Sequence, residues 1–419
     1  MSLMTTIDGA FVGRGIGSDA LAAVNIFCPL WLLVSGIGLM LGIGCSVVAS
    51  IHLSRGNKKA ANINFTQSVI CGIVIATILL LLVNIFAVPT SRLLGASDQL
   101  LPYVLEYQKW LSLAFVAIFL SCTGQLIIRL DGSPKYAMIC SSLPSIINVI
   151  LDYVFLFIFD MGLEGIAIAT MTGCWCGGIL AIYYILFLKK NIHLCRIKFS
   201  IKSLKLTLRN IGYQSKLGFS ALLGDLCIGV LMFIGNYVFL KYLGEDGVAA
   251  FSVVCYVLPF VFMTGNAIAQ SAQPIISFNY GTNNSQRVSL TRKLMIKTSV
   301  IIGIVITLTL VFGNSIITSF FLSSECNAYQ LATKGIPYVA IGFIPYILNV
   351  ALIGYYQSIE RAATATLYSL MRCGIILIPC FLLMPLAAGE IGIWLAMPLT
   401  EIITLVLIFS NRQRATTIG

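Results

Sequence analysis

Long apolar runs, most of them roughly 20 residues or more, alternate with short polar stretches along this 419-residue chain. A helix of about 20 apolar residues crosses the roughly 30 Å hydrocarbon core of a bilayer and satisfies its own backbone hydrogen bonds there. We therefore predict an all-α membrane protein with twelve transmembrane segments, the first of them short. The predicted segments are 1–13, 20–53, 62–88, 103–128, 135–159, 164–188, 214–240, 247–279, 295–322, 334–358, 363–386 and 391–411.

The composition excludes an ordinary water-soluble domain. Hydrophobic residues make up 58% of the chain and charged residues only 10%, where a soluble domain has about 25%. The thirteen cysteines are scattered, and the two histidines, His52 and His193, lie beside predicted loops. Zinc binding and histidine-based catalysis therefore have almost no suitable residues, and we expect no resident cofactor.

The net charge of +11 could indicate nucleic acid binding, but the distribution of the charge indicates membrane topology instead. Twenty of the 26 basic residues follow the even-numbered segments, whereas the opposite loops are rich in acids. Positive charge gathers on the cytoplasmic side of membrane proteins. We predict that the C-terminus is cytoplasmic and that the chain binds lipid and no nucleic acid.

The longest polar connection, Lys189–Lys216, carries eight basic residues and separates two sets of six segments. We expect it to lie on anionic lipid headgroups. Two pairs of similar stretches share a single offset in residue number: 13–27 matches 240–254, and 162–169 matches 389–396. Both halves begin on the same side of the membrane, so they are predicted to be parallel repeats facing a central cleft, as in transporters. The predicted parts are an N-terminal lobe (1–188), a linker (189–213), a C-terminal lobe (214–411) and a cytoplasmic tail (412–419).

Four oxygen-bearing residues are predicted at one depth of the N-terminal lobe. Asn148 and Asp152 share a helix face, because they are four residues apart. Asp152, Thr170 and Asp8 each lie roughly 8–10 Å below the outer surface at 1.5 Å per residue. Such a cluster suits a hard cation, or two carboxylates that share a proton. The alternative is four unrelated polar residues, each satisfied locally.

Other ionisable residues inside the segments have a structural interpretation. Glu106 and Lys109 are three residues apart on one helix face and are predicted to pair. Arg372 and Glu401 are predicted to be partners between helices 11 and 12.

Several stretches resemble the multidrug and toxic compound extrusion (MATE) transporters. They are DGAFVGRGIGSDALAAVNIFCP at 8–29, IRLDGSPKYAM at 128–138, NVILDYVF at 148–155 and GLEGIAIAT at 162–170. In one branch of that family an Asp of helix 1, an Asn and an Asp of helix 5 and a Thr of helix 6 bind the coupling Na⁺ or H⁺. The resemblance implies that role for Asp8, Asn148, Asp152 and Thr170, which would be metal ligands if the ion is Na⁺.

The chain departs from the family at two places. Only seven residues precede Asp8, so either the start codon is misassigned or the first span is incomplete. Helix 10 has no acid before Glu360 at its end, unlike a second branch of the family, and Asp225 is a candidate contact for a cationic substrate.

The predicted function is a monomeric, cation-coupled (H⁺ or Na⁺) antiporter in the cytoplasmic membrane of a bacterium, which exports amphipathic, often cationic drugs or toxic metabolites. The alternatives are a flippase for a lipid-linked precursor, which would need a strongly cationic cleft, and a membrane-embedded enzyme, which would need a catalytic constellation that the histidines do not provide.

Overall fold

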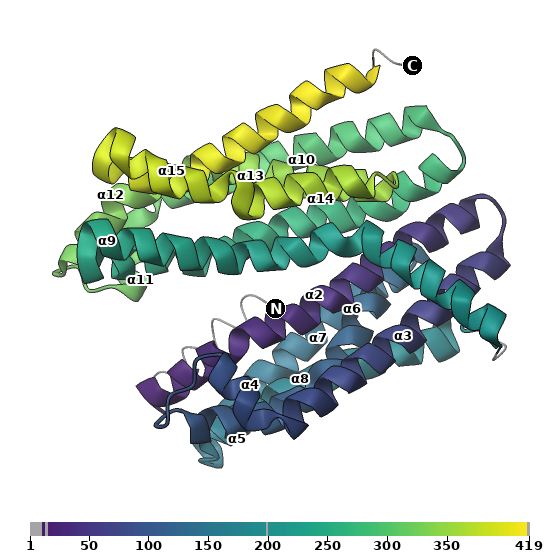
Figure 1. The fold of residues 1–419 in the computed structure, drawn as a ribbon, viewed down its shortest axis with the longest axis horizontal. Coiled ribbons are helices and arrows are strands. Elements are labelled where there is room, and N and C mark those ends of the chain that lie inside the picture. Colours follow the sequence, from purple (N-terminus) through teal and green to yellow (C-terminus); the bar gives the residue numbers. More distant parts are fainter. Residues whose placement is uncertain (1–10, 13–15, 198–199, 417–419) are drawn as a thin grey trace. The chain divides into compact units, whose positions relative to one another are not determined.

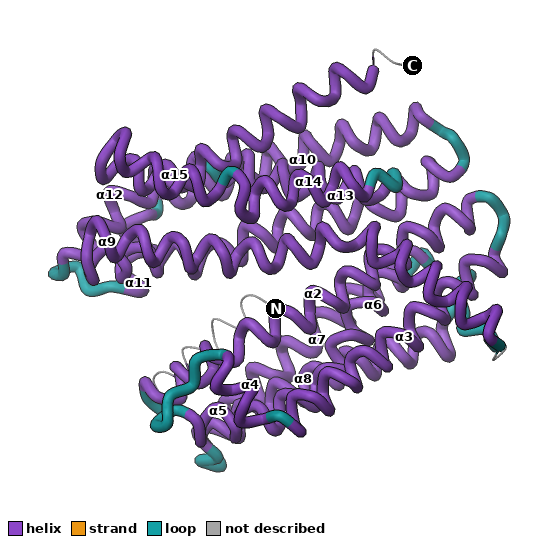
Figure 2. The backbone as a smooth tube through the Cα atoms, viewed as in Figure 1, coloured by secondary structure: helices purple, strands orange, loops and turns teal. Residues whose placement is uncertain are grey.

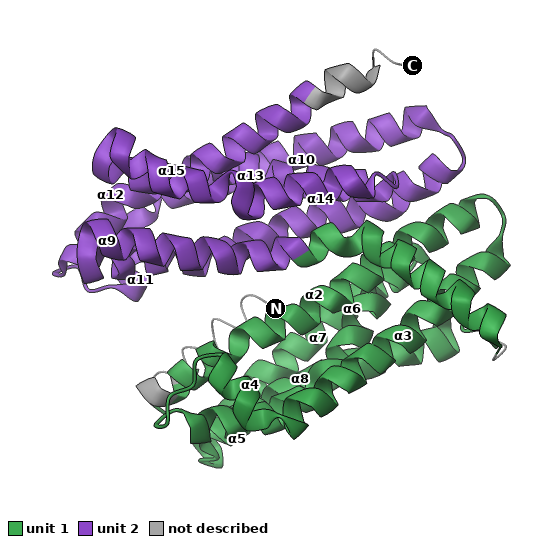
Figure 3. Ribbon diagram, in the orientation of Figure 1, with its two compact units in different colours: residues 1–222 green, residues 223–419 purple. Residues whose placement is uncertain are grey.

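The computed structural model describes residues 11–12, 16–197 and 200–416, and nearly all of these residues are helical (Figure 1, Figure 2). The prediction of an all-α protein is therefore confirmed. Asp8 and most of the first predicted segment lie outside the described residues. The chain divides into two compact units, residues 1–222 (unit 1) and 223–419 (unit 2), which Figure 3 distinguishes by colour.

Unit 1 is a bundle in which α2 packs against α3, α5 and α6, and α7 packs against α8. A 3₁₀ segment joins α5 to α6, and π-helical turns extend α7 and α8. The elements are α2 (Ser18–Ser54), α3 (Lys58–Ile85), α4 (Ala87–Leu93), α5 (Leu101–Leu111), η1 (Ser112–Ala114), α6 (Phe115–Leu130), α7 (Pro134–Tyr153), η2 (Val154–Ile158), α8 (Gly162–Tyr183) and η3 (Tyr184–Leu188).

The boundary between the units falls inside α9 (Ile201–Gly281), which is broken at Gly244, where φ is 66°. The last helix is broken in the same way at Ala388 and Gly389. The further elements of unit 2 are α10 (Ser285–Phe312), α11 (Asn314–Phe321), α12 (Asn327–Ile341), α13 (Phe343–Ser358), α14 (Ala362–Leu370), η4 (Met371–Ile375, a π-helical turn) and α15 (Leu377–Thr416).

The described helices correspond to the predicted segments from the second to the twelfth. Eight helices are long and apolar enough to cross a membrane, or nine when the bent pair α12 and α13 counts as one span. Two of these helices, α9 and the stretch 362–410, contain the breaks at Gly244 and Gly389 and hold two spans each. The described part of the chain therefore has eleven spans.

The internal repeat is visible in the helix boundaries. The offset that relates 13–27 to 240–254 also carries both ends of α3 onto both ends of α10, and the start of α4 onto the start of α11. The same offset carries Gly162, where α8 begins, onto the break at Gly389. The two units thus carry the same succession of helices, as the sequence repeat predicted.

The basic connection is more ordered than a surface linker would be. Asp131, at the end of α6, accepts hydrogen bonds from the backbone N–H groups of Lys190, Asn191 and Ile192 at 2.7–3.0 Å. Helix α9 begins at Ile201, well before the predicted start at 214, because it is fixed to α3 by polar contacts within unit 1. These include Gln67 Nε2 to Thr207 Oγ1 and Asn210 Nδ2 to Gln67 Oε1, both 2.9 Å.

Helices α2 and α9 cross at two glycines of unit 1. A Cβ atom on Gly44 would lie 2.0 Å from the backbone oxygen of Gln214, and one on Gly218 would lie 1.8 Å from that of Met40. Small residues allow helix backbones to approach this closely inside a membrane.

Candidate functional site

The first group of buried polar residues lies between α7 and α8. Asn148 and Asp152 on α7 are both 0% exposed, and Thr170 on α8 is 4% exposed. The Asn148 side-chain amide donates a hydrogen bond of 3.3 Å to the Thr170 hydroxyl. The structure therefore brings together an amide and a hydroxyl, with the Asp152 carboxylate one helical turn further along α7.

The carbonyl oxygen of the Asn148 side chain is buried and has no hydrogen-bond partner among the described residues. A buried acceptor without a donor costs about 1–3 kcal/mol, so such an atom is expected to meet a ligand or a water molecule. An oxygen that has lone pairs to offer, next to a carboxylate, is suited to a hard cation.

Local backbone features place these side chains. Gly173 on α8 allows close packing, because a Cβ atom there would lie only 3.0 Å from the Cβ of Asn148 and from the Pro144 carbonyl oxygen. The π-helical turn η2 begins two residues after Asp152. Turns of this kind occur mostly as single insertions in α-helices and are frequent at functional sites.

Asp8, the fourth predicted member of the cluster, lies outside the described residues. The nearest described side chain that follows it is Phe11, which packs edge-on against Phe157 of η2, with ring centroids 5.6 Å apart. Val12 is fully buried in the core of unit 1. Phe11 therefore lies beside η2, the π-helical turn that continues α7.

Asp225, the predicted substrate contact, lies on α9 in unit 2 and is 3% exposed. Asp225 forms no ion pair with any residue that the structure describes. The predicted pair of Glu106 and Lys109 is not formed. Lys109 instead lies over the ring of Trp110, 5.1 Å from its centroid.

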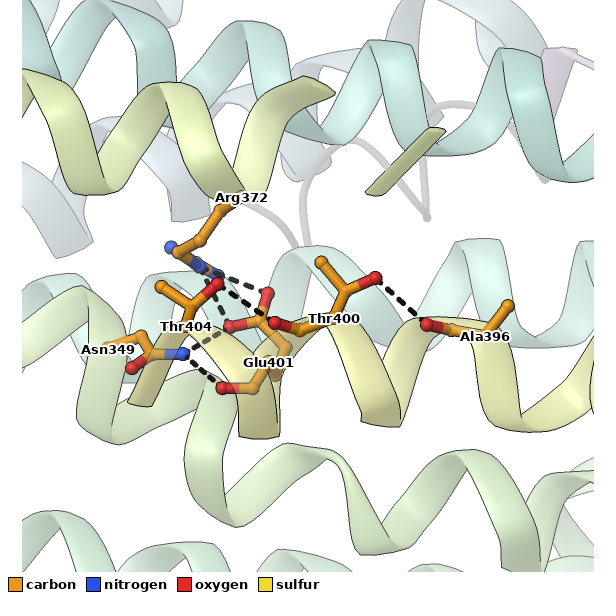
Figure 4. Close-up of polar contacts among 6 residues, drawn as sticks. All are labelled: Asn349, Arg372, Ala396, Thr400, Glu401 and Thr404. Atoms are coloured by element: carbon orange, nitrogen blue, oxygen red, sulfur yellow. Dashed lines mark hydrogen bonds and ion pairs between the residues drawn. The ribbon is translucent and has the colours of Figure 1, made fainter. Parts of the chain in front are cut away.

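The second polar group lies inside unit 2 and includes the predicted pair of Arg372 and Glu401 (Figure 4). Arg372 Nε lies 3.0 Å and 2.8 Å from the two carboxylate oxygens of Glu401. The Asn349 amide donates to Glu401 Oε2 at 2.7 Å and to the Glu401 backbone oxygen at 2.8 Å. The ring of Tyr346 covers the guanidinium, whose central carbon is 4.4 Å from the ring centroid.

All four side chains are nearly inaccessible, with exposed fractions of 0–3%. They come from three elements, α13, η4 and α15. Arg372 Nη2 and Asn349 Oδ1 have no hydrogen-bond partner among the described residues. Removing one member of a buried ion pair costs about 3–5 kcal/mol, because the other charge is left without compensation. The sequence indicated the pair, but it did not indicate that Asn349 and Tyr346 complete the group.

Two helical units that repeat each other, with ionisable groups buried inside their membrane spans, are typical of a polytopic membrane transporter. Comparison with known proteins supports this class and narrows it. The family profile MatE matches residues 1–154 and 221–382, which is most of the chain. The chain belongs to the MATE family; it is a multi-pass membrane transporter and not an enzyme.

Relatives and solved structures agree along nearly the whole length. The FAD transporter of Shewanella oneidensis is 24% identical over 97% of this chain and 89% of its own. The multidrug export protein MepA of Staphylococcus saprophyticus is 24% identical over 99% of this chain and 92% of its own. A multidrug resistance MATE transporter of the MOP superfamily, solved in an outward-facing conformation, has the same fold with a TM-score of 0.89 at 20% identity, covering 99% of this chain and 92% of that one.

Proposed function

We propose that this protein is a cation-coupled antiporter that exports amphipathic, often cationic drugs or toxic metabolites from a bacterium. It would act as a monomer in the cytoplasmic membrane, with its C-terminus in the cytoplasm. The observation that carries the proposal is the buried group of Asn148, Asp152 and Thr170, which offers a carboxylate, an amide oxygen and a hydroxyl in a lipid-embedded helix pair. The multidrug export proteins named MepA among its relatives support the substrate class.

The coupling ion would be H⁺ or Na⁺. Ionised carboxylates are expensive inside a membrane, so Asp152 gains from taking up a proton or binding a cation. The ion would enter from outside and favour one packing of unit 1, from which the drug is released outward. Coupling of this kind requires that the ion bind one of two conformations more tightly than the other, since an ion that binds both equally shifts nothing.

The sign of the buried charge favours cationic over anionic substrates. In the described spans the buried charged side chains are Asp152, Asp225, Glu401 and Arg372. Arg372 is the only buried Lys or Arg among the described residues, and Glu401 neutralises it. An anionic substrate such as the one named for the Shewanella oneidensis relative, or the pyrophosphate of a lipid-linked precursor, would need cationic groups that remain available.

The test of the site is drug efflux from cells that lack other drug pumps. Asp152→Asn should abolish efflux driven by the ion gradient. Asp160→Asn is the matched control, because Asp160 is an exposed acid that follows the same helix, and this variant should retain efflux. Unchanged efflux in Asp152→Asn, at normal expression, would remove this residue from the mechanism.

A second measurement identifies the ion. A proton gradient and a Na⁺ gradient are each imposed alone on everted vesicles that contain the protein, and one of the two should drive uptake of a fluorescent cationic drug. Uptake under neither gradient, with active protein in the vesicles, would contradict ion coupling, and uptake driven by only one gradient names the ion.

A further inference from the structure

Unit 2 contains a polar group of the same chemical kinds as the one in unit 1. In unit 1 the group is a carboxylate, an Asn amide and a Thr hydroxyl, on α7 and α8. In unit 2 the corresponding kinds are Glu401, Asn349 and Thr404, and Thr404, one turn beyond Glu401, is 0% exposed. The Thr404 hydroxyl donates to the Thr400 carbonyl at 2.8 Å, so the lone pairs of its oxygen stay available.

The internal repeat places Arg372 and Glu401 on the helices equivalent to α7 and α8, whereas Asn349 lies on α13, the equivalent of α6. With the offset that relates α3 to α10, Asn148 corresponds to position 375 and Thr170 to position 397. Arg372 lies three residues before the first of these positions, and Glu401 lies four residues after the second. The helix that carries Arg372 and the helix that carries Glu401 run in opposite directions. Arg372 and Glu401 are therefore each displaced by about one turn from the equivalents of Asn148 and Thr170, toward the same end of unit 2, the end that holds Arg361.

The difference between the two groups is the guanidinium of Arg372. It contacts both carboxylate oxygens of Glu401 through Nε (Figure 4). The Tyr346 ring also packs on it, with the ring centroid 4.4 Å from its central carbon. Its charge therefore occupies the place beside the carboxylate where a mobile cation would bind. The remaining donor Nη2 and the acceptor Asn349 Oδ1 have no hydrogen-bond partner among the described residues, so the arginine does not use every polar atom of the site.

We infer that Arg372 is a tethered cation that fills a carboxylate site in unit 2, so that this site exchanges neither H⁺ nor Na⁺. Without the guanidinium, Glu401, Asn349 and Thr404 become a site for a proton or a monovalent cation. A buried carboxylate that loses its cationic partner takes up a proton or another cation, because an isolated ionised group in an apolar interior is strongly unfavourable. The consequence for ion coupling rests on the proposed function, but the site itself does not.

A control variant separates the titration of Glu401 from that of the neighbouring groups. Besides Arg372, the groups that face it are the phenol of Tyr346 and the thiols of Cys227 on α9 and Cys373 on η4. The variant that lacks both Arg372 and Glu401 keeps all three of these groups. A dependence on pH that appears when Arg372 is replaced, and is lost when Glu401 is replaced as well, therefore reports on Glu401.

The test measures the thermal unfolding midpoint of the purified full-length protein in detergent, as a function of pH and of NaCl, with choline chloride holding the ionic strength constant. All variants carry Asp152→Asn, so that the group in unit 1 does not contribute. The added substitutions are Arg372→Gln, Arg372→Lys, and Arg372→Gln with Glu401→Gln. Arg372→Lys keeps a tethered positive charge and is the matched control.

We expect the Arg372→Gln protein to be stabilised by acid or by Na⁺. The ratio of folded to unfolded protein should rise by up to tenfold for each tenfold rise in the concentration of the ion that binds. The Arg372→Lys protein and the double Arg372→Gln, Glu401→Gln protein should show the same dependence as the parent. An Arg372→Gln protein whose dependence equals that of the parent would overturn the inference.

The inference remains testable if Arg372→Gln does not fold under ordinary conditions. Recovery of folded protein in acid or Na⁺, or on addition of Glu401→Gln, supports a carboxylate that requires a cation, and failure of both overturns it. The unfolding measurement does not depend on transport. It can therefore contradict the role of Arg372 while Asp152 still proves essential for efflux, and it can support that role while Asp152 proves dispensable for efflux.

Discussion

The crossing of α2 and α9 in unit 1 gives a quantitative prediction. In Gly44→Ala, the new Cβ lies 2.0 Å from the Gln214 backbone oxygen, far inside the 3.4 Å at which ordinary contact begins. The obstacle is backbone rather than the end of a flexible side chain, so the helices must separate. The matched control is Gly212→Ala, at an exposed helical position where nothing lies within 4 Å of the new atom.

The control removes the effect of helix propensity. Replacing a helical glycine by alanine stabilises a helix by about 0.5–1 kcal/mol, and this gain is present in both variants. The difference between them therefore reports the clash, for which overpacking in well-packed interiors predicts about 1–3 kcal/mol. Gly44→Ala should thus be less stable than Gly212→Ala by that amount.

Reversible unfolding in mixed micelles measures this difference. Gly218→Ala should behave like Gly44→Ala, because its Cβ would lie 1.8 Å from the Met40 backbone oxygen at the same crossing. The double Gly44→Ala, Gly218→Ala variant should lose less than the sum of the two single losses, since one separation of the helices relieves both clashes. Equal stability of Gly44→Ala and Gly212→Ala would refute the close approach.

Two further predictions concern polar contacts in unit 1. Asp131→Asn removes a carboxylate that accepts three backbone hydrogen bonds, each worth about 1.5–3 kcal/mol when the acceptor is charged. The variant should therefore be less stable than the parent and should be cleaved faster by a protease after Lys190. Equal rates of proteolysis in the variant and the parent would contradict the anchoring of this segment. Thr170→Val removes the acceptor of the hydrogen bond from the Asn148 amide, so it should lower the stability by about 1 kcal/mol and weaken the stabilisation by the coupling ion. Thr170→Ser keeps the hydroxyl and should retain the stability and the response to the ion. A Thr170→Val protein with unaltered ion dependence would exclude the hydroxyl from the site.

Part of the candidate sites could be predicted from sequence because helical spacing is local. Asn148 and Asp152 share a helix face because they are four residues apart, and Arg372 and Glu401 are recognisable in the sequence as charged residues inside apolar segments. The pairing of Glu106 with Lys109 was wrong, because spacing on one helix does not exclude another partner on the same helix. In the structure, Lys109 lies over the Trp110 ring, whose Nε1 donates to Glu164 of α8 at 2.7 Å.

The start of α9 could not be predicted from hydrophobic periodicity. Its first turns carry basic residues such as Lys202 and Lys205 and exposed apolar residues such as Leu204 and Leu208. Because apolar residues are exposed there as well, the sequence shows no clear helical period of apolar positions. The polar contacts of Thr207 and Asn210 with Gln67 of α3 fix this part of the helix, and a contact between residues so distant in sequence is invisible to local reasoning.

The sequence by itself determined the membrane class, the spans and the repeat. A bilayer imposes a length and an apolar composition on each helix, and the repeat preserves helix boundaries such as those of α3 and α10. Only the tertiary structure decided which polar side chains meet. Asn349 and Tyr346 join Arg372 and Glu401 because three helices pack at one level, and the energy of a buried charge depends on those neighbours rather than on its place in the chain.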